Sequence, residues 1–167
     1  MEDQKINRTI LRYMIQNDYD VLEAENGAQA WSILEENSEE IIAILLDIVM
    51  PVMDGYEFLK RLKDSPWEGI PVIAMTGDSD ISTEERTLEL GAWDFIIKPY
   101  KERILMTRLK NAIARSRMGY LQQMKHMAEH DSVTGLYNRM HFFKKTEEML
   151  KKYPTEPFVF IRMDIKR

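Results

Sequence analysis

The chain of 167 residues contains no cysteine. Disulfides and thiolate metal sites are therefore excluded, and the composition agrees with the reducing cytoplasm. No apolar run approaches the roughly 18 residues that a membrane-spanning helix needs, and the amino-terminal sequence MEDQKINR is not a signal peptide. Lys and Arg number 23 against 28 Asp and Glu, and this net charge of -5 argues against nucleic acid as the main partner. These absences leave a globular protein that works in the cytoplasm, away from membranes.

The composition and length describe a folded chain with room for more than one domain. Hydrophobic residues make up 44% and charged residues 31% of the chain, which is typical of globular rather than disordered proteins. A chain of this length holds one ordinary domain and part of a second.

Short apolar segments alternate with amphipathic helical patterns over the first hundred residues. Strands are predicted at 19–24, 41–47, 70–77 and 93–99. Helices are predicted around the apolar stripes of residues 4–18, 30–34, 54–65 and 82–91, with Asp54 as an N-cap. The unalternating run IIAILLD is typical of a parallel strand buried on both faces. The order of elements predicts an α/β fold with a doubly wound parallel sheet.

Three polar side chains follow three of these strands at the point where each ends: Asp47, Thr76 and Lys98. Ligands of such sheets bind outside the carboxyl ends of the strands. A carboxylate there can act as a nucleophile toward a phosphoryl group, while a lysine pairs with phosphoryl oxygens and a threonine donates a hydrogen bond. Glu2 and Asp3 offer further oxygens for a hard cation such as Mg²⁺. The pattern predicts an aspartyl phosphate site.

The segments LLDIVMPVMDGYEFLKRLK, VIAMTG and FIIKPY resemble the receiver domain of two-component response regulators, over residues 1 to about 115. The resemblance implies a flavodoxin-like fold with Asp47 as the phosphoacceptor. It implies a histidine kinase or a phosphotransfer protein as the phosphoryl donor. Thr76 would be the switch hydroxyl, Lys98 the lysine that pairs with the phosphate, and Phe95 the switch aromatic residue.

The same resemblance implies a magnesium site. Mg²⁺ would be bound by Asp3, Asp47 and the main-chain carbonyl of Val49, with Glu2 as the other member of the acidic pair. It also implies a cis peptide bond between Lys98 and Pro99.

The chain departs from this family at its first strand. An apolar strand normally leads into the acidic pair, but here the pair follows Met1 directly. That strand normally lies inside the sheet, and its two neighbours would otherwise expose unpaired backbone. Either the start of the sequence is misplaced or another segment fills the vacant position. The apolar segment PFVFIRMD at 157–164 is a candidate, in its own chain or by exchange between two chains.

One long helix is predicted over residues 101–129. Met106, Ile113, Tyr120 and Met127 recur in it every seven residues, which favours helix pairing in a homodimer. The alternative is a final receiver helix that packs on its own domain.

The segment HDSVTGLYNRMHF resembles the entry of GGDEF domains, which make cyclic di-GMP from two GTP molecules. FVFIRMDIKR resembles the first strand of that domain, where Asp164 and the Ile165 carbonyl match metal-binding positions, but Lys166 replaces the usual second Asp. The signature GGDEF loop is not among the 167 residues, so this chain alone is not expected to be an enzyme. The parent protein would be an active diguanylate cyclase, or a degenerate GGDEF protein that only binds partners or nucleotide. The predicted domains are a receiver domain at 1–115, a helical linker at 116–130 and a GGDEF fragment at 131–167.

Two rival functions have weaker support. HMAEH at 126–130 fits the zinc pattern H-x-x-E-H, with His126 and His130 on one helical face, but two surface histidines on a linker helix explain it more simply. The basic residues of the long helix are spread around it, and no helix-turn-helix follows, so a solvated face explains them better than DNA binding.

Overall fold

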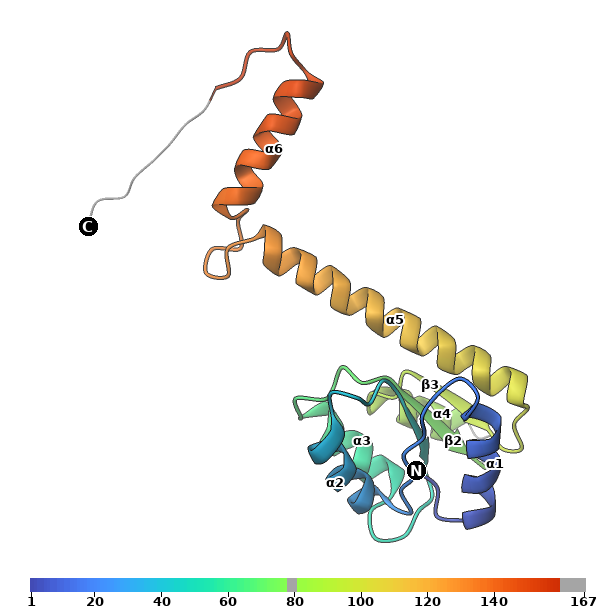
Figure 1. Ribbon diagram of the computed structural model, residues 1–167. Helices are drawn as coiled ribbons and strands as arrows, with labels where there is room; N and C mark the ends of the chain where they lie inside the picture. Colours follow the sequence, from blue (N-terminus) through green and yellow to red (C-terminus); the bar gives the residue numbers. More distant parts are fainter. Residues whose placement is uncertain (78–80, 160–167) are drawn as a thin grey trace. The chain divides into compact units, whose positions relative to one another are not determined.

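The computed structural model describes residues 1–77 and 81–159 (Figure 1). The chain divides into two compact units, Met1–Gly119 and Tyr120–Arg167. The first unit contains helices α1 (Lys5–Ile15), α2 (Gly27–Asn37), α3 (Gly55–Lys63) and α4 (Ile81–Glu89) and strands β1 (Ile44–Asp47), β2 (Val72–Thr76) and β3 (Asp94–Ile97). Helix α5 (Glu102–Glu129) begins in the first unit and ends in the second, which also contains α6 (Arg139–Lys152).

The sheet of the first unit is parallel, and its described strands lie in the order β1-β2-β3. Every residue of β2 is buried, and its side chains alternate between two hydrophobic clusters. Val72 and Ala74 pack in the cluster with α2 and α3, whereas Ile73 and Met75 pack in the cluster with α1 and α5. Helices therefore cover both faces, as Figure 1 shows, and the predicted flavodoxin-like, doubly wound fold is confirmed.

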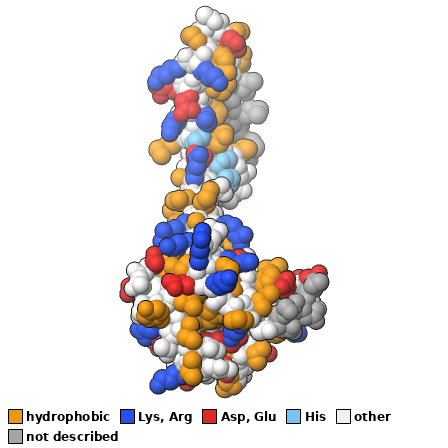
Figure 2. All heavy atoms as spheres, turned by 90° about the vertical axis from the view of Figure 1, so that its right-hand side faces the viewer, with side chains coloured by type: hydrophobic (Ala, Val, Ile, Leu, Met, Phe, Trp, Pro, Cys, Tyr) orange, Lys and Arg blue, Asp and Glu red, His pale blue; other side chains and the backbone are white. Residues whose placement is uncertain are grey.

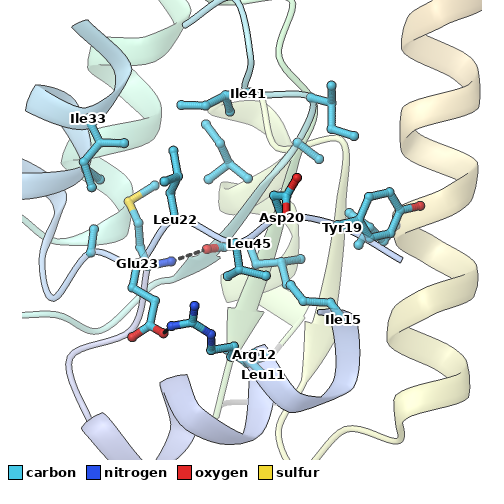
Figure 3. A pocket seen from close by; sticks show the side chains of 18 of the residues that line it. Leu11, Arg12, Ile15, Tyr19, Asp20, Leu22, Glu23, Ile33, Ile41 and Leu45 are labelled. Atoms are coloured by element: carbon cyan, nitrogen blue, oxygen red, sulfur yellow. Dashed lines mark hydrogen bonds and ion pairs between the residues drawn. The ribbon is translucent and has the colours of Figure 1, made fainter. Parts of the chain in front are cut away.

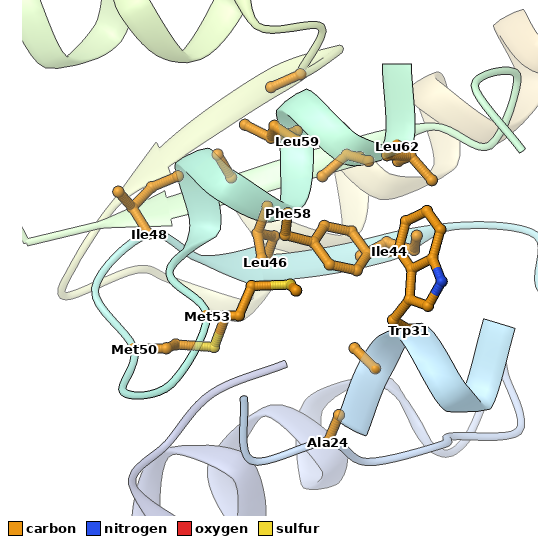
Figure 4. Packing of buried hydrophobic residues seen from close by; sticks show 14 of the residues in the cluster. Ala24, Trp31, Ile44, Leu46, Ile48, Met50, Met53, Phe58, Leu59 and Leu62 are labelled. Carbon is orange, nitrogen blue, oxygen red and sulfur yellow. The ribbon is translucent and has the colours of Figure 1, made fainter. Parts of the chain in front are cut away.

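The cluster under α2 and α3 is built around aromatic rings (Figure 4). The Trp31 ring on α2 meets the Phe58 ring on α3 edge to face, with 6.0 Å between their centroids. Phe58 is fully buried and anchors α3 to the sheet. This packing fixes the start of α3, which follows directly on the loop after β1.

The strand predicted at 19–24 is wrong, because these residues have no strand partner. Met1 and Glu2 lie in the position between this segment and β1. The Met1 amino group donates to the Leu45 carbonyl at 2.7 Å, the Asp47 N–H donates to the Met1 carbonyl at 3.1 Å, and the Glu2 N–H donates to the Ala24 carbonyl at 3.1 Å. Two residues are too few to continue the sheet across to residues 19–24. Burial lowers the pKa of the Met1 amino group to about 6.

The loop after β1 closes on a glycine. The Asp54 carboxylate caps α3 by accepting the Glu57 N–H at 2.8 Å, as the sequence predicted. A Cβ atom at Gly55 would lie 2.6 Å from both the Asp47 carbonyl oxygen and the Ile48 Cα atom. The backbone around Asp47 can pass this close to α3 only because residue 55 has no side chain.

We therefore expect Gly55→Ala to displace the carboxyl end of β1. Forcing this clash should lower the free energy of unfolding by about 1–3 kcal/mol in a urea titration. Gly69→Ala is the matched control, because a Cβ atom at Gly69 meets nothing within 4 Å. Equal stability of the two variants would show that the loop after β1 has room to move.

Helix α5 confirms the predicted long helix. The residues of its seven-residue pattern are partly or fully buried in the first part of the helix and exposed in the second. Leu105, Leu109 and Ile113 are buried in the first unit, with Ile113 only 6% exposed. Tyr120 and Met127 are 63% and 66% exposed. A pairing surface between two chains would therefore have to begin after Ile113. No helix in the described ranges, α5 included, is long and apolar enough to span a membrane.

The second unit contains a tight turn between α5 and α6. The Asp131 carboxylate accepts the N–H groups of Val133 and Thr134 and the Thr134 hydroxyl, and the Asn138 side chain caps α6. Hydrophobic side chains remain exposed here, among them Met140 at 81% and Phe143 at 53%. Figure 2 shows hydrophobic side chains, in orange, among charged ones in blue and red.

Most residues named in the predictions for the carboxyl terminus are outside the ranges that the structure describes. Asp164, Ile165 and residues 160–164 of the predicted strand lie outside the described residues. Residues 157–159 are described, and they carry no strand.

Candidate functional site

The three predicted polar residues meet at the carboxyl edge of the sheet. Asp47 ends β1, Thr76 ends β2 and Lys98 directly follows β3. The parallel register aligns Asp47 with Met75 and Thr76 with Ile97, and the Lys98 N–H donates to the Thr76 carbonyl at 2.7 Å. Parallel strands bring residues far apart in the sequence to one edge, which is why their positions were predictable.

Lys98 joins the two carboxylates of the site. Its Nζ lies 2.7 Å from Asp47 Oδ2 and 2.7 Å from Glu2 Oε2. The Glu2 side chain is fully buried, the Asp47 side chain is 5% exposed, and the Lys98 side chain is 23% exposed. Two buried carboxylates are thus held around one shared cation.

The surroundings shift the pKa values of all three groups. Burial alone would lower the pKa of Lys98, but hydrogen bonds to Asp47 and Glu2 outweigh burial and raise it. Burial alone would raise the pKa of Glu2, but hydrogen bonds from Lys98 and Asn7 lower it. Burial raises the pKa of Asp47, and the Lys98 ammonium only partly offsets this. Further positive charge beside Asp47 would therefore favour its ionised, nucleophilic form.

Two residues that position the acidic pair were missed by sequence reasoning. The Arg8 guanidinium donates to the main-chain carbonyls of Glu2 and Asp3, each at 2.8 Å, and the Asn7 side chain donates to Glu2 Oε1 at 3.0 Å. Arg8 is buried on the same face of α1 as Leu11. An arginine on an apolar helical stripe is the sequence signal that would have revealed it.

The acidic residues also form a candidate metal site. Carboxylate oxygens of Glu2, Asp3 and Asp47 all lie within 4.8 Å of one another, and within the described ranges no other such cluster of acidic or imidazole groups occurs. Oxygen ligands of this kind suit Mg²⁺, which keeps several waters and needs few protein ligands. His126 and His130, which fit the zinc pattern H-x-x-E-H, lie outside the cluster, and their rings stack at 4.0 Å between centroids.

Comparison with known families identifies the domain to which this edge belongs. The family model of the response regulator receiver domain matches residues 1–110. The chain belongs to the receiver domain family. Receiver domains of this kind act in two-component systems and bind Mg²⁺ at an acidic site.

Similar proteins agree with this assignment. The receiver domain is 34% identical over 114 residues to Histidine kinase P4 of Formosa agariphila, covering 68% of this chain and 8% of that protein. The receiver domain of sensor histidine kinase PA1611 from Pseudomonas aeruginosa is 28% identical, with a TM-score of 0.60, covering 68% of this chain and 93% of that one. Its crystal structure has magnesium coordinated in the active site cleft.

A second similar structure is that of a probable two-component system response regulator/GGDEF domain protein. It is 22% identical, with a TM-score of 0.64, and the match covers 70% of this chain and 48% of that one. At this identity the likeness concerns the fold alone. The chain thus spans less than half of the kinase and of this protein.

Thr76 and Phe95, the predicted switch residues, have different surroundings in the receiver domain. Thr76 is 4% exposed, whereas Phe95 is partly buried and borders a shallow depression of about 270 Å³ with Tyr100 and Ile104. Their switching role stays a prediction. The cis peptide bond between Lys98 and Pro99 is confirmed. The Val49 N–H donates to Asp47 Oδ1 at 3.3 Å, so the residue whose carbonyl is the predicted metal ligand bonds directly to the phosphoacceptor candidate.

Proposed function

We propose that this receiver domain accepts a phosphoryl group on Asp47 from a histidine kinase or a phosphotransfer protein. The observation that supports the proposal is the shared contact of Lys98 with Asp47 and Glu2, beside the exposed edge of an acidic cluster. The absence of cysteine agrees with the cytoplasm as the place of this reaction.

Each residue of the site has a part in the transfer. An ionised Asp47 oxygen attacks the phosphorus, the bond from phosphorus to the donor nitrogen breaks, and the donor imidazole leaves with the electron pair and an acyl phosphate remains. Lys98 exchanges a carboxylate contact for a phosphoryl oxygen, and the Thr76 hydroxyl donates to another. Mg²⁺ bound by Asp3, Asp47 and the Val49 carbonyl, with Glu2 beside them, would supply the charge neutralisation that phosphoryl transfer needs.

We further propose that phosphorylation controls a GGDEF output through dimerisation. The HDSVTGLYNRMHF segment supports the GGDEF assignment, and the exposed Tyr120 and Met127 of α5 support a pairing surface after Gly119. The parent protein would then be a diguanylate cyclase or, because Lys166 replaces an acidic residue, a degenerate GGDEF protein that binds partners or nucleotide.

Beryllofluoride with Mg²⁺, a mimic of the phosphorylated aspartate, should increase the dimer fraction in light scattering. Light scattering should be measured at protein concentrations where the untreated chain is partly monomeric. Asp47→Asn is the control, because it keeps the shape of the side chain but should not respond. An unchanged dimer fraction of the unsubstituted chain across these concentrations would contradict phosphorylation-driven pairing.

A further inference from the structure

All three histidines of the chain, His126, His130 and His141, lie in the second unit. The acidic cluster around Asp47 contains no histidine, and none lines the cavity of about 540 Å³ that Figure 3 shows in the first unit. Imidazole suits Zn²⁺ and similar transition metals, whereas carboxylates suit Mg²⁺. A metal ion that prefers imidazole would therefore bind away from the acidic cluster.

His126 and His130 lie about one helical turn apart at the carboxyl end of α5. The His130 N–H donates to the His126 carbonyl at 2.9 Å, so the helical spacing extends to His130. His126 is exposed and His130 is half-buried, and Figure 2 shows histidine side chains, in pale blue, at the surface. Their rings stack with 4.0 Å between centroids and 23° between planes. Two nitrogens bound to one tetrahedral zinc ion, each at about 2.0–2.1 Å, lie roughly 3.4 Å apart, so the rings are already close to the separation that a shared ion needs.

A backbone contact fixes which ring nitrogen of His130 carries the proton. Its Nδ1 lies 2.8 Å from the Gly135 carbonyl oxygen. A carbonyl oxygen can only accept, so the proton is on Nδ1 and Nε2 keeps its lone pair. Histidines that bind metal ions usually donate their other ring N–H to a carbonyl or carboxylate in this way, which orients the ring and makes it a better ligand. His130 is thus held in the tautomer that binds a metal ion.

The neighbouring groups have other partners. Glu129 Oε1 lies 3.7 Å from His141 Nδ1 and 4.0 Å from Lys125 Nζ. The Tyr137 ring packs against both His130 and His141, with centroids 4.7 and 4.6 Å away. In the described ranges, no third acidic or imidazole group completes a cluster with the pair. Each chain therefore offers two imidazoles, which is half of the four ligands that a structural zinc site uses.

The two imidazoles flank a residue of the proposed pairing surface. Met127 is 66% exposed, directly follows His126 and precedes His130 by three residues, so all three side chains lie on one side of the helix. A twofold axis beside this side would bring two imidazoles from each copy together. Four nitrogen ligands complete a closed tetrahedral site.

We propose that two copies of the chain share one Zn²⁺ ion, with His126 and His130 of each copy as its ligands. The ion ties the two α5 helices together beside the turn that leads into α6, so it stabilises the paired state. A closed site leaves no position for a reacting water, so the ion is structural and the pair is not a peptidase centre. The inference rests on the pairing of α5 proposed above, but not on phosphoryl transfer.

Zn²⁺ alone is the probe, added to the full chain without a histidine tag, and saturating Mg²⁺ keeps the acidic cluster occupied. Native mass spectrometry should show a dimer that carries one zinc ion, and light scattering should show a larger dimer fraction without beryllofluoride. His126→Ala should weaken zinc binding at least about tenfold in calorimetry. His126 is exposed and Ala favours helices, so this variant should keep the fold. His141→Gln is the matched control, because it removes the remaining imidazole and should leave zinc binding unchanged.

Two results would overturn the shared site. One is zinc bound to the monomer with no rise in the dimer fraction, and the other is zinc binding that survives His126→Ala. Beryllofluoride should still increase the dimer fraction of His126→Ala, and zinc should still increase that of Asp47→Asn. A failed metal site can therefore be told apart from a failed phosphorylation switch.

Discussion

Asp47→Asn is expected to reduce phosphorylation by acetyl phosphate to background. The carboxylate is the nucleophile, and an amide of the same size cannot form the acyl phosphate. Lys98 would keep its contact with Glu2, so the remaining site should stay assembled. Intact-mass measurement after incubation with acetyl phosphate and Mg²⁺ should show one added phosphoryl group on the unsubstituted chain and none on the variant. Hydroxylamine, which cleaves acyl phosphates, should remove the group.

Asp54→Asn is the matched control for this experiment. Asp54 lies in the same loop but is exposed, and its carboxylate caps α3. Asn caps a helix about as well as Asp does, so both the fold and the labelling should survive. Equal labelling of Asp47→Asn and the unsubstituted chain would move the phosphoacceptor away from Asp47 and remove the central proposal.

Lys98→Met is expected to destabilise the domain strongly when Mg²⁺ is absent. The Lys98 ammonium lies 2.7 Å from two carboxylates that are almost fully buried. Removing one partner of a buried ion pair typically costs about 3–5 kcal/mol, because the remaining charge is left without compensation. Urea denaturation in the presence of a chelator measures this loss. A loss below about 1 kcal/mol, the value of an exposed pair, would mean that water already screens this site.

Two further measurements separate the effect of charge from that of packing at Lys98. Lys98→Met combined with Asp47→Asn should be more stable than Lys98→Met alone, because the second substitution removes one of two like charges. Saturating Mg²⁺ should also restore part of the stability of Lys98→Met by binding beside Glu2 and Asp3. Neither rescue is expected if the lysine acts only through its aliphatic stem.

The edge of the sheet was predictable because strand ends are local features of the sequence. Asp47, Thr76 and Lys98 each follow an apolar run, and the rule that parallel strands share one carboxyl edge brings them together. The segment at 19–24 shows the limit of such reasoning. Its residues have strand character, but a strand exists only where a neighbour supplies hydrogen bonds, and two residues at Met1 and Glu2 are too few.

The long helix shows a second limit. Seven-residue spacing fits both a coiled-coil seam and the apolar stripe of a helix packed on its own domain. Ile113 belongs to the domain core and Tyr120 to the exposed part, and periodicity gave no sign of the change between them. Arg8 shows a third limit, because a charged residue on the apolar stripe of α1 indicates burial but does not specify the Glu2 and Asp3 carbonyls to which it donates.

The one-sided bonding of β1 has a consequence for amide hydrogen exchange. The amides of Ile44 and Ile48 are held by backbone carbonyls and open only when the sheet opens. The amides of Ala43 and Leu45 lie on the other side of the strand, away from β2. Neighbouring residues of one strand should therefore exchange at very different rates, because only every second amide bonds to β2.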